Sequence, residues 1–413
     1  MKPLFQKPEL LSPAGDMARL KAAIQFKADA VYLGGTVFGM RSAPENFSEE
    51  ALEEAVALAH GSGVKVYLTV NVLPRSADLA ELPRFLSHAE SCGVDALIVS
   101  DLGVLDYAKR YAPGVAIHMS TQTGIVNYAA ANACYRLGAR RIVTARELSL
   151  DEIRTLRKNI PQDMEIECFV HGAMCVSFSG RCLLSNYLTG RDANRGACAQ
   201  PCRWKYALTE EKRPGQFFPL EDAEDGGTYI LNARDLCMIE HIPELIDAGV
   251  SSFKIEGRAK SEYYVAVVTN AYRKAIDAYT ENPEDFVLPQ WIKDEVTKVS
   301  CRDYCTGFYF DDPRENAQIS FRGGYDRAWD VMAVVEHWEN GVARCTQRNR
   351  FFVGDTLEVL TPDAVPFSVT ASELRNAEGE PVQATNHPMM VFSFPCETPL
   401  PDGAILRKQR EAE

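Results

Sequence analysis

Short, continuously apolar runs recur through residues 1–257, and most follow an amphipathic segment that ends in glycine. Gly63, Gly93, Gly138 and Gly249 each stand where a glycine suits the left-handed C-cap of a helix, and a β-rich run follows each of them. Runs that are apolar throughout, rather than alternating, are typical of parallel strands covered by helices. The pattern therefore predicts repeated strand–helix units.

Eight such strands are predicted, in the segments ELLSPAG, ADAVYLGG, VKVYLTV, VDALIVS, VAIHMSTQT, ARRIVTA, MEIECFVHG and VSSFKIE. Helical patterns such as SEEALEEAVALAH lie between most of them. Eight units favour an α/β fold of the TIM type, a (β/α)8 barrel, with a doubly wound open sheet as the alternative. We assign residues 1–282 to this barrel, which the long amphipathic helix SEYYVAVVTNAYRKAIDAY completes.

The pattern changes beyond the barrel. Pro283 and Pro289 mark its edge, and residues 283–320 are interpreted as a helical connection or linker. From residue 321 to 413 the apolar runs are short and alternating, with turns at ENG, VGD and AEGEP. This pattern predicts a small C-terminal all-β domain, an antiparallel β-barrel or sandwich.

Polar residues stand where the predicted barrel strands end, which is the end at which TIM barrels carry their chemistry. We take His171 and Glu256 as candidate catalytic residues, although His171 could equally be a structural hydrogen-bonding group. The ends of the strands also carry Arg41, Asn71, Ser120, Thr121, Gln122, Arg146, Glu147, Lys254 and Arg258.

A cysteine-rich insertion, residues 167–237, follows the seventh predicted strand. Its first forty residues hold five of the twelve cysteines of the chain, with several glycines between them that let the backbone wrap closely. Cys168 lies in the apolar run IECFV and is interpreted as a small buried hydrophobe. Two pairs remain, Cys175 with Cys182 and Cys198 with Cys202, and they offer four thiolates to an inorganic centre.

The spacing of these cysteines favours a cluster. Structural zinc usually uses tight C-x2-4-C pairs, which the seven-residue step from Cys175 to Cys182 fits poorly. An iron–sulfur cluster tolerates looser spacing, so we prefer it to zinc and to unmetallated thiols. Disulfides are not expected, because residues 1–11 have no apolar signal core and no apolar run approaches 18 residues. The chain is predicted to be cytoplasmic, with no membrane partner.

The net charge of −13, from 44 basic and 57 acidic residues, argues against a general nucleic-acid coat. The cysteine-rich insertion differs from the rest of the chain. Between residues 181 and 205 it contains five basic residues against Asp192 alone, namely Arg181, Arg191, Arg195, Arg203 and Lys205.

Several stretches resemble a known family. Residues 167–182, ELLSPAG and FKIEGR resemble blocks of the collagenase-like family catalogued as peptidases of unknown type, and the resemblance covers nearly the whole chain. ARELSLDEI and GTYILNARDL are similar to segments of its prephenate-dependent tRNA uridine 5-hydroxylase branch. The resemblance implies an enzyme that makes 5-hydroxyuridine at the wobble position of tRNA. Sister branches hydroxylate ribosomal RNA or act on a quinone precursor.

The resemblance also implies a [4Fe–4S] cluster, with the iron–sulfur assembly machinery as a partner. Carried over by position, its ligands are Cys175, Cys182, Cys198 and Cys202. A sister branch uses the position of Cys237 in place of Cys202. We favour Cys202, because Cys198 and Cys202 are close in sequence and need no long loop closure.

Prephenate, the implied co-substrate, is a dianion and calls for cationic anchors, for which arginine is well suited. The candidates are Arg41, Arg146, Lys254 and Arg258, although each could be the structural partner of a nearby glutamate. For tRNA phosphates the candidates are Arg191, Arg195, Arg203 and Lys205, joined in the β-rich domain by Arg348, Arg350, Arg407 and Lys408.

Two other classes of function remain. A serine or cysteine peptidase needs a nucleophile beside a base, yet only His118 and His171 among the seven histidines lie near strand ends, and neither has an obvious nucleophile. The zinc-protease sequence H-E-x-x-H is absent. A non-catalytic iron–sulfur scaffold would not need a charged barrel mouth.

Overall fold

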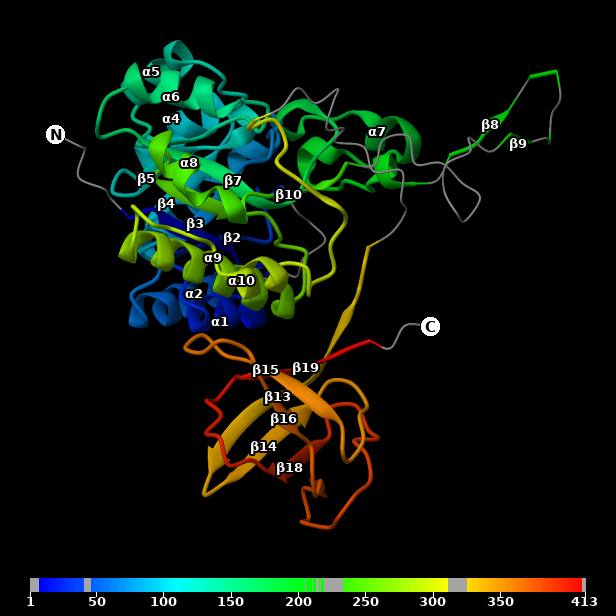
Figure 1. Cartoon of the computed structure of the whole chain (residues 1–413). Coiled ribbons are helices and arrows are strands. Elements are labelled where there is room, and N and C mark those ends of the chain that lie inside the picture. Colours follow the sequence, from blue (N-terminus) through cyan, green and yellow to red (C-terminus); the bar gives the residue numbers. More distant parts are fainter. Residues whose placement is uncertain are drawn as a thin grey trace.

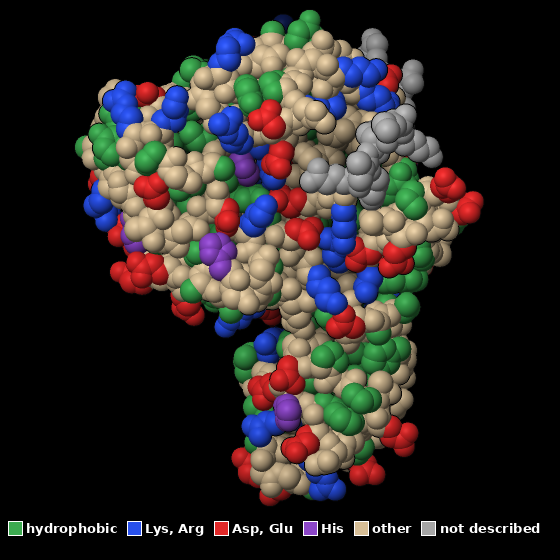
Figure 2. Space-filling view, turned by 90° about the vertical axis from the view of Figure 1, so that its left-hand side faces the viewer, with side chains coloured by type: hydrophobic (Ala, Val, Ile, Leu, Met, Phe, Trp, Pro, Cys, Tyr) green, Lys and Arg blue, Asp and Glu red, His purple; other side chains and the backbone are tan. Residues whose placement is uncertain are grey.

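The computed structural model describes residues 7–40, 46–204, 206–209, 211–212, 215, 217–218, 233–310 and 325–410. Two of the predicted site residues, Arg41 and Lys205, therefore lie outside the described residues. The chain forms a large α/β lobe and a smaller β-rich lobe below it (Figure 1). On the face shown in Figure 2, acidic and basic side chains are interspersed over both lobes.

The large lobe is a closed barrel, as predicted. Its parallel strands are hydrogen-bonded in the order β11-β1-β2-β3-β4-β5-β6-β7, and pairing of β11 with β7 closes the ring. The strands are β1 (Glu9–Pro13), β2 (Ala30–Gly34), β3 (Lys65–Val70), β4 (Ala96–Val99), β5 (Ala116–Met119), β6 (Arg141–Val143), β7 (Glu165–Ala173) and β11 (Ser252–Ile255). The (β/α)8 prediction is confirmed.

Helices surround these strands (Figure 1). Most begin at a side chain that caps them, as Ser149 does by accepting the amide of Glu152 in a capping box. The glycines predicted to end helices all have positive φ, between 73° at Gly63 and 107° at Gly138. The helices of the barrel are α1 (Met17–Gln25), α2 (Glu49–Gly61), α3 (Leu82–Ser91), α4 (Leu102–Tyr111), α5 (Tyr128–Arg136), α6 (Leu150–Lys158), α8 (Ile242–Asp247) and α9 (Glu262–Glu281).

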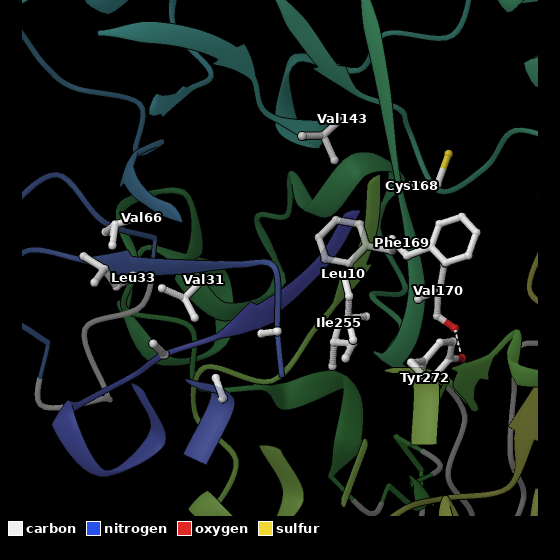
Figure 3. Close-up of a cluster of buried hydrophobic side chains, with 14 of the residues drawn as sticks. Leu10, Val31, Leu33, Val66, Val143, Cys168, Phe169, Val170, Ile255 and Tyr272 are labelled. Carbon is white, nitrogen blue, oxygen red and sulfur yellow. Dashed lines mark hydrogen bonds between the residues drawn. The ribbon is translucent and has the colours of Figure 1, made fainter. Parts of the chain in front are cut away.

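Side chains on the outer face of the strands form the main core with these helices (Figure 3). Tyr272 of α9 is fully buried there and donates a hydrogen bond of 2.7 Å to the carbonyl of Val170 in β7. Cys168 is also fully buried, and burial raises the pKa of its thiol to about 12. Its environment fits the packing role inferred from the sequence.

The cysteine-rich insertion leaves β7 and returns to it. After η3 (Phe178–Gly180) and α7 (Leu184–Thr189) come η4 (Ala193–Arg195), η5 (Pro201–Arg203) and a short hairpin, β8 (Leu208–Thr209) with β9 (Phe217–Phe218). The chain then forms β10 (Asp235–Cys237), antiparallel to the end of β7. In Figure 1, α7 lies on the right-hand side of the barrel, next to β10.

Residues 283–310 also join the large lobe. They form α10 (Gln290–Glu295) and β12 (Tyr304–Cys305), and β12 pairs in parallel with β10 at the edge of the barrel sheet. Ile292, Val296 and Tyr309 are buried in the same core as the barrel strands. This part of the predicted connection is thus packed into the barrel core.

The C-terminal domain is an antiparallel sheet with its own core, in the order β16-β15-β19-β13-β14-β18-β17. The all-β prediction is confirmed. Its strands are β13 (Trp329–Glu339), β14 (Val342–Gln347), β15 (Thr356–Leu360), β16 (Phe367–Thr370), β17 (Arg375–Asn376), β18 (Val391–Pro395) and β19 (Ile405–Gln409).

Arg407 of this domain, predicted as an RNA-phosphate contact, is buried and not exposed to a ligand. Its side chain is fully buried and forms ion pairs with Glu295 of α10 and Glu358 of β15, both at 2.5 Å. The carboxylates outweigh the burial that by itself would lower the pKa of the guanidinium. Arg407 instead ties the β-rich domain to the barrel, a pairing between residues 112 positions apart that sequence alone could not indicate.

Candidate active site at the barrel mouth

A polar cavity opens at the carboxyl ends of the barrel strands. Its floor and walls come from β2, β3, β4, η2 (Thr121–Thr123), β6, β7, β11 and the loops that follow the strands. The described lining residues are Tyr32, Met40, Thr69, Asn71, Ile98, Ser120, Thr121, Gln122, Val143, Arg146, Phe169, Lys254, Glu256 and Arg258. The structure thus brings Arg146, Lys254, Glu256 and Arg258 together, as the prediction required.

Arg146 lies across one wall of the cavity. Its guanidinium carbon is 3.8 Å from the centre of the Phe169 ring, and Nη1 donates to the carbonyl of Ala173 at 2.8 Å. Nη2 lies 3.7 Å from Oε2 of Glu256. Stacking and the backbone contact hold the planar fork in one orientation, which favours bidentate recognition of a carboxylate.

Arg258 is almost completely buried at 3% exposure, and its Nη1 donates to the hydroxyl of Thr69 at 3.2 Å. Gly34 makes room for it, because a Cβ at that position would come within 2.0 Å of Nη1. The glycine at the end of β2 is therefore needed for the arginine to reach the cavity.

The charge of Lys254 is offset by a buried carboxylate in the barrel interior. Its ammonium nitrogen lies 2.7 Å from Oε1 of Glu167, which is fully buried, and 4.5 Å from the centre of the Tyr32 ring. Among the described lining residues the cavity therefore has three cations and a single carboxylate, Glu256. Even with Glu167 offsetting Lys254, this arrangement favours an anionic ligand.

Glu167 connects the cavity to an ion network in the barrel interior. Its Oε2 lies 3.0 Å from Nη1 of Arg141, and Arg141 also pairs with Glu9 and Glu165, each at 2.6 Å. Burial by itself lowers the pKa of the Arg141 guanidinium. The charges of Glu9 and Glu167 raise it by more than burial lowers it, so the net shift is upward. The guanidinium is charged, and the network holds both cations in place.

We expect Glu167→Gln to lower the free energy of unfolding by about 3–5 kcal/mol, because it leaves Lys254 buried with a neutral partner. The matched control is Glu165→Gln, which removes a partner of the same Arg141 but is 47% exposed. It should cost about 1 kcal/mol or less. Denaturant unfolding of both variants tests this difference, and equal losses would show that Glu167 is not the critical partner.

His171 does not line this cavity in the described structure. It is buried among three tyrosines, with Tyr304 Oη 3.4 Å from Nε2 and Tyr272 Oη 3.5 Å from Nδ1. Burial lowers the pKa of the imidazole to about 3. The ring is therefore neutral at physiological pH and belongs to the barrel wall beside β10, which supports the structural interpretation left open above.

This histidine should make the protein acid-sensitive. An unfolded histidine binds a proton below about pH 6.5, whereas His171 in the folded chain binds one only near pH 3, so stability falls as the pH drops through that range. The loss approaches roughly 3–5 kcal/mol at the acid end. His171→Gln should flatten the dependence of unfolding free energy on pH between 7 and 5.

The flattening should be partial, because burial also lowers the pKa of His118 well below its ordinary value. His387→Gln is the control, since that side chain is exposed. Urea unfolding at several pH values measures the slopes. A slope that is the same in wild type and His171→Gln would rule out a neutral buried imidazole at this position.

The sulfurs of three cysteines in the insertion accept hydrogen bonds from nearby backbone amides. Amides two residues further along donate to the sulfurs of Cys175, Cys182 and Cys198, at 3.5, 3.4 and 3.4 Å. The donors are Ser177, Leu184 and Gln200. Amide hydrogen bonds to sulfur stabilise thiolates and tune iron–sulfur centres. The loops are therefore already shaped around these three sulfurs.

Cys202 completes the group. Burial raises the pKa of its thiol, and the electrostatic influence of Cys175, Cys198 and Cys182 adds to the rise, whereas Arg203 opposes it. Cys237 lies elsewhere, paired in register with His171 and hydrogen-bonded to Tyr272, and burial raises its pKa to about 12. The structure places Cys202, rather than Cys237, with the other three thiols.

The separation of the four sulfurs bears on the kind of metal. A single zinc ion at about 2.3 Å from each sulfur holds its ligands within about 4 Å of one another. Among the described residues, the three-membered group whose ligand atoms lie within 4.8 Å of one another is Glu53, His88 and Cys92, not a set of these cysteines. In the described residues these four sulfurs are thus not gathered as closely as a single zinc ion requires.

The insertion is fixed to the loops of the mouth. The amide of Ser179 donates to Glu147 at 2.8 Å, directly after Arg146. Arg195 forms a two-point ion pair with Asp78 at 2.6 and 3.1 Å, so part of its charge is already partnered within the protein. The four-cysteine group therefore lies beside the cavity, on the same end of the barrel.

Sequence reasoning missed Tyr32, Thr69 and Phe169 as cavity residues. Tyr32 and Thr69 stand two positions before Gly34 and Asn71, at the ends of β2 and β3, and Phe169 stands two positions after Glu167, whose side chain faces the barrel interior. Residues two apart on a strand face the same side, so alternate positions upstream of each end point into the barrel. Period-two reading of the strands would have found all three.

A closed barrel with a charged cavity at its carboxyl-terminal mouth is the architecture of a (β/α)8-barrel enzyme. Family models match nearly the whole chain, as peptidase family U32 over residues 15–319 and as the C-terminal domain of peptidase family U32 over residues 327–407. The chain belongs to peptidase family U32.

Relatives in this family carry different names. The chain is 37% identical to the tRNA hydroxylation protein P1 of Bacillus subtilis, over 98% of this chain and 96% of that one. It is 41% identical to a 23S rRNA 5-hydroxycytidine synthase of Escherichia coli, over 67% of this chain and 40% of that one. It is also 36% identical to a collagenase of Porphyromonas gingivalis, over 73% of each chain. In the part of the chain that the structure describes, no helix is long and apolar enough to cross a membrane.

Proposed function

We propose that this protein is an RNA hydroxylase that converts the wobble uridine of tRNA to 5-hydroxyuridine in a prephenate-dependent reaction. The observation that carries the proposal is the group of four cysteines beside an ionised cavity that favours an anion. The near full-length similarity to a tRNA hydroxylation protein supports RNA as the substrate class. The 23S rRNA relative supports the same chemistry on a pyrimidine.

Cys175, Cys182, Cys198 and Cys202 would hold a [4Fe–4S] cluster, which supplies one-electron chemistry when bound. The cavity residues would bind and orient the small substrate. Arg146 and Arg258 bind the two carboxylates of prephenate, and Lys254, fixed by Glu167, adds a third positive charge beneath them. Glu256 is the carboxylate placed to hold or release a proton in this cavity, beside the hydroxyl of Tyr32 at 3.4 Å.

The direct test is hydroxylation in vitro. Anaerobically purified protein is incubated with unmodified tRNA, with and without prephenate, and the nucleosides are analysed by mass spectrometry. Gain of one oxygen atom at the wobble uridine only when prephenate is present is the expected result. Transfer of oxygen to another RNA would redirect the proposal to a different substrate, and no transfer to any RNA would reject it.

Peptidase activity, which the collagenase relative suggests, has less support in the cavity. Its described lining residues include no histidine and no cysteine, and the hydroxyl of Ser120 donates to Gln122 Oε1 at 3.2 Å. A serine or cysteine nucleophile needs a base within hydrogen-bond reach. Incubation of the same preparation with gelatin should leave the gelatin intact.

A further inference from the structure

Exposed large apolar side chains are concentrated around the barrel mouth. Ten of the twenty exposed large hydrophobic residues of the described chain lie there, and they come from the loops after β2, β4, β5 and β7. They are Val37, Leu102, Val126, Tyr128, Val176, Phe178, Leu183, Tyr187, Leu188 and Trp204. A concentration of this kind marks an interaction surface.

The densest part of this surface is on the cysteine-rich insertion. Tyr187 of α7 is 81% exposed and Trp204, at the end of η5, is 45% exposed. α7 and η5 are in contact, and the amide of Ala199 donates to Ser185 at 3.0 Å to hold them together. Two aromatic rings are thus presented to solvent from neighbouring, mutually braced elements.

The same elements carry exposed positive charge. Arg181 and Arg191 are exposed, and Arg203, half-buried, reaches the hydroxyl of Tyr325 at 2.8 Å. The one acidic residue of this stretch, Asp192, lies 3.7 Å from Arg75. In a chain of net charge −13 this local excess of arginine stands out, and it is complementary to a polyanion.

We infer that this surface, formed by Phe178, Arg181, Leu183, Tyr187, Arg191 and Trp204, binds unpaired bases of an RNA loop by stacking. The inference rests on the function proposed above and specifies how the substrate is recognised. Aromatic rings stack on splayed bases, whereas the bases of a duplex are stacked on one another and cannot reach them. Arginines beside the rings hold the phosphates.

The position of the surface fits this role. An enzyme that modifies a base must take it out of the stack and into a pocket. Bases flanking the target nucleotide would then need a platform close to the cavity, and the insertion lies at the mouth, tied to Glu147 next to Arg146. Tyrosine, tryptophan and arginine are also common in protein interfaces, but a local excess of arginine in a chain of net charge −13 favours a polyanion such as an RNA loop.

The test uses two RNA probes, a hairpin with a uridine-containing loop and a blunt duplex of the same stem sequence. We expect the wild type to prefer the hairpin. Tyr187→Ala with Trp204→Ala removes two stacking platforms, so the double variant should weaken hairpin binding by about thirtyfold or more and leave duplex binding almost unchanged. Tyr187→Phe should bind as wild type, because the ring is kept.

Two further measurements separate stacking from charge. Arg181→Gln with Arg191→Gln should reduce the slope of log K against log salt by up to about 2, whereas the aromatic variants should keep the wild-type slope. Trp204 is the exposed tryptophan of the described chain, so hairpin binding should quench its fluorescence. Phe352→Ala, an exposed aromatic of the β-rich domain, is the control and should bind as wild type.

Unchanged hairpin affinity in the Tyr187 and Trp204 double variant, at wild-type iron content, would overturn the inference. An equal loss of affinity for the hairpin and the duplex in this variant would also overturn it. So would the finding that the variant no longer binds a protein partner while its affinity for RNA is unchanged. Failure of stacking is distinguishable from failure of the proposed function. In the first case wild-type protein still hydroxylates tRNA, and in the second it transfers no oxygen however the RNA binds.

Discussion

Cys182→Ala is expected to yield a colourless protein that hydroxylates no tRNA. If the four cysteines hold an iron–sulfur cluster, removal of one thiolate takes away a ligand and the amide donor of Leu184 loses its acceptor. The same result is expected for Cys175→Ala and Cys198→Ala, whose sulfurs accept equivalent hydrogen bonds. Visible absorption and iron and sulfide content of anaerobically purified variants measure the loss without reference to activity.

The chain provides its own controls. Cys168→Ala and Cys134→Ala change buried thiols in the core and should keep full colour, with only a packing loss of stability. Comparison of Cys202→Ala with Cys237→Ala identifies the fourth ligand of the cluster. We expect Cys202→Ala to be colourless and Cys237→Ala to keep the brown colour of the wild type. A colourless wild-type protein with one zinc per chain and full activity would refute the cluster.

The sequence was sufficient for the fold because the signal was repetitive. A single apolar run or a single helix-ending glycine is a weak signal. Eight apolar runs in succession, four of them preceded by such a glycine, leave few topologies open. The ends of the predicted strands then locate the mouth of the barrel. Arg146, Lys254, Glu256 and Arg258 were found in this way, since their roles follow from where strands stop.

What the sequence could not give is pairing across long distances. His171 stands at a strand end like the others, yet β10 returns from 64 residues further on to cover it, and the ring becomes buried. The charges of Arg195 and Arg407 are partnered by Asp78 and Glu358, which no local pattern connects to them. Only the three-dimensional arrangement distinguishes these two arginines from those that line the cavity.

Arg146→Ala should raise the prephenate concentration needed for half-maximal hydroxylation by about thirtyfold or more, while colour and iron content stay at the wild-type level. The estimate follows from the 2–5 kcal/mol that loss of one partner of a buried, hydrogen-bonded charge pair typically costs. Arg146→Lys should recover only part of the loss, because an ammonium keeps the charge but not the bidentate fork that Phe169 and Ala173 orient.

Arg258 allows the second anchor to be tested separately. Arg258→Lys keeps a positive charge at a 3% exposed position, whereas Arg258→Ala also leaves a void, so thermal stability must be measured beside the kinetics. Arg195→Ala is the matched control, since it removes an arginine of the same face that is paired with Asp78 and should leave the prephenate dependence unchanged. If both Arg146 and Arg258 variants hydroxylate tRNA normally at limiting prephenate, the dianion binds outside this cavity, and the positive charge at the mouth serves the RNA phosphates instead.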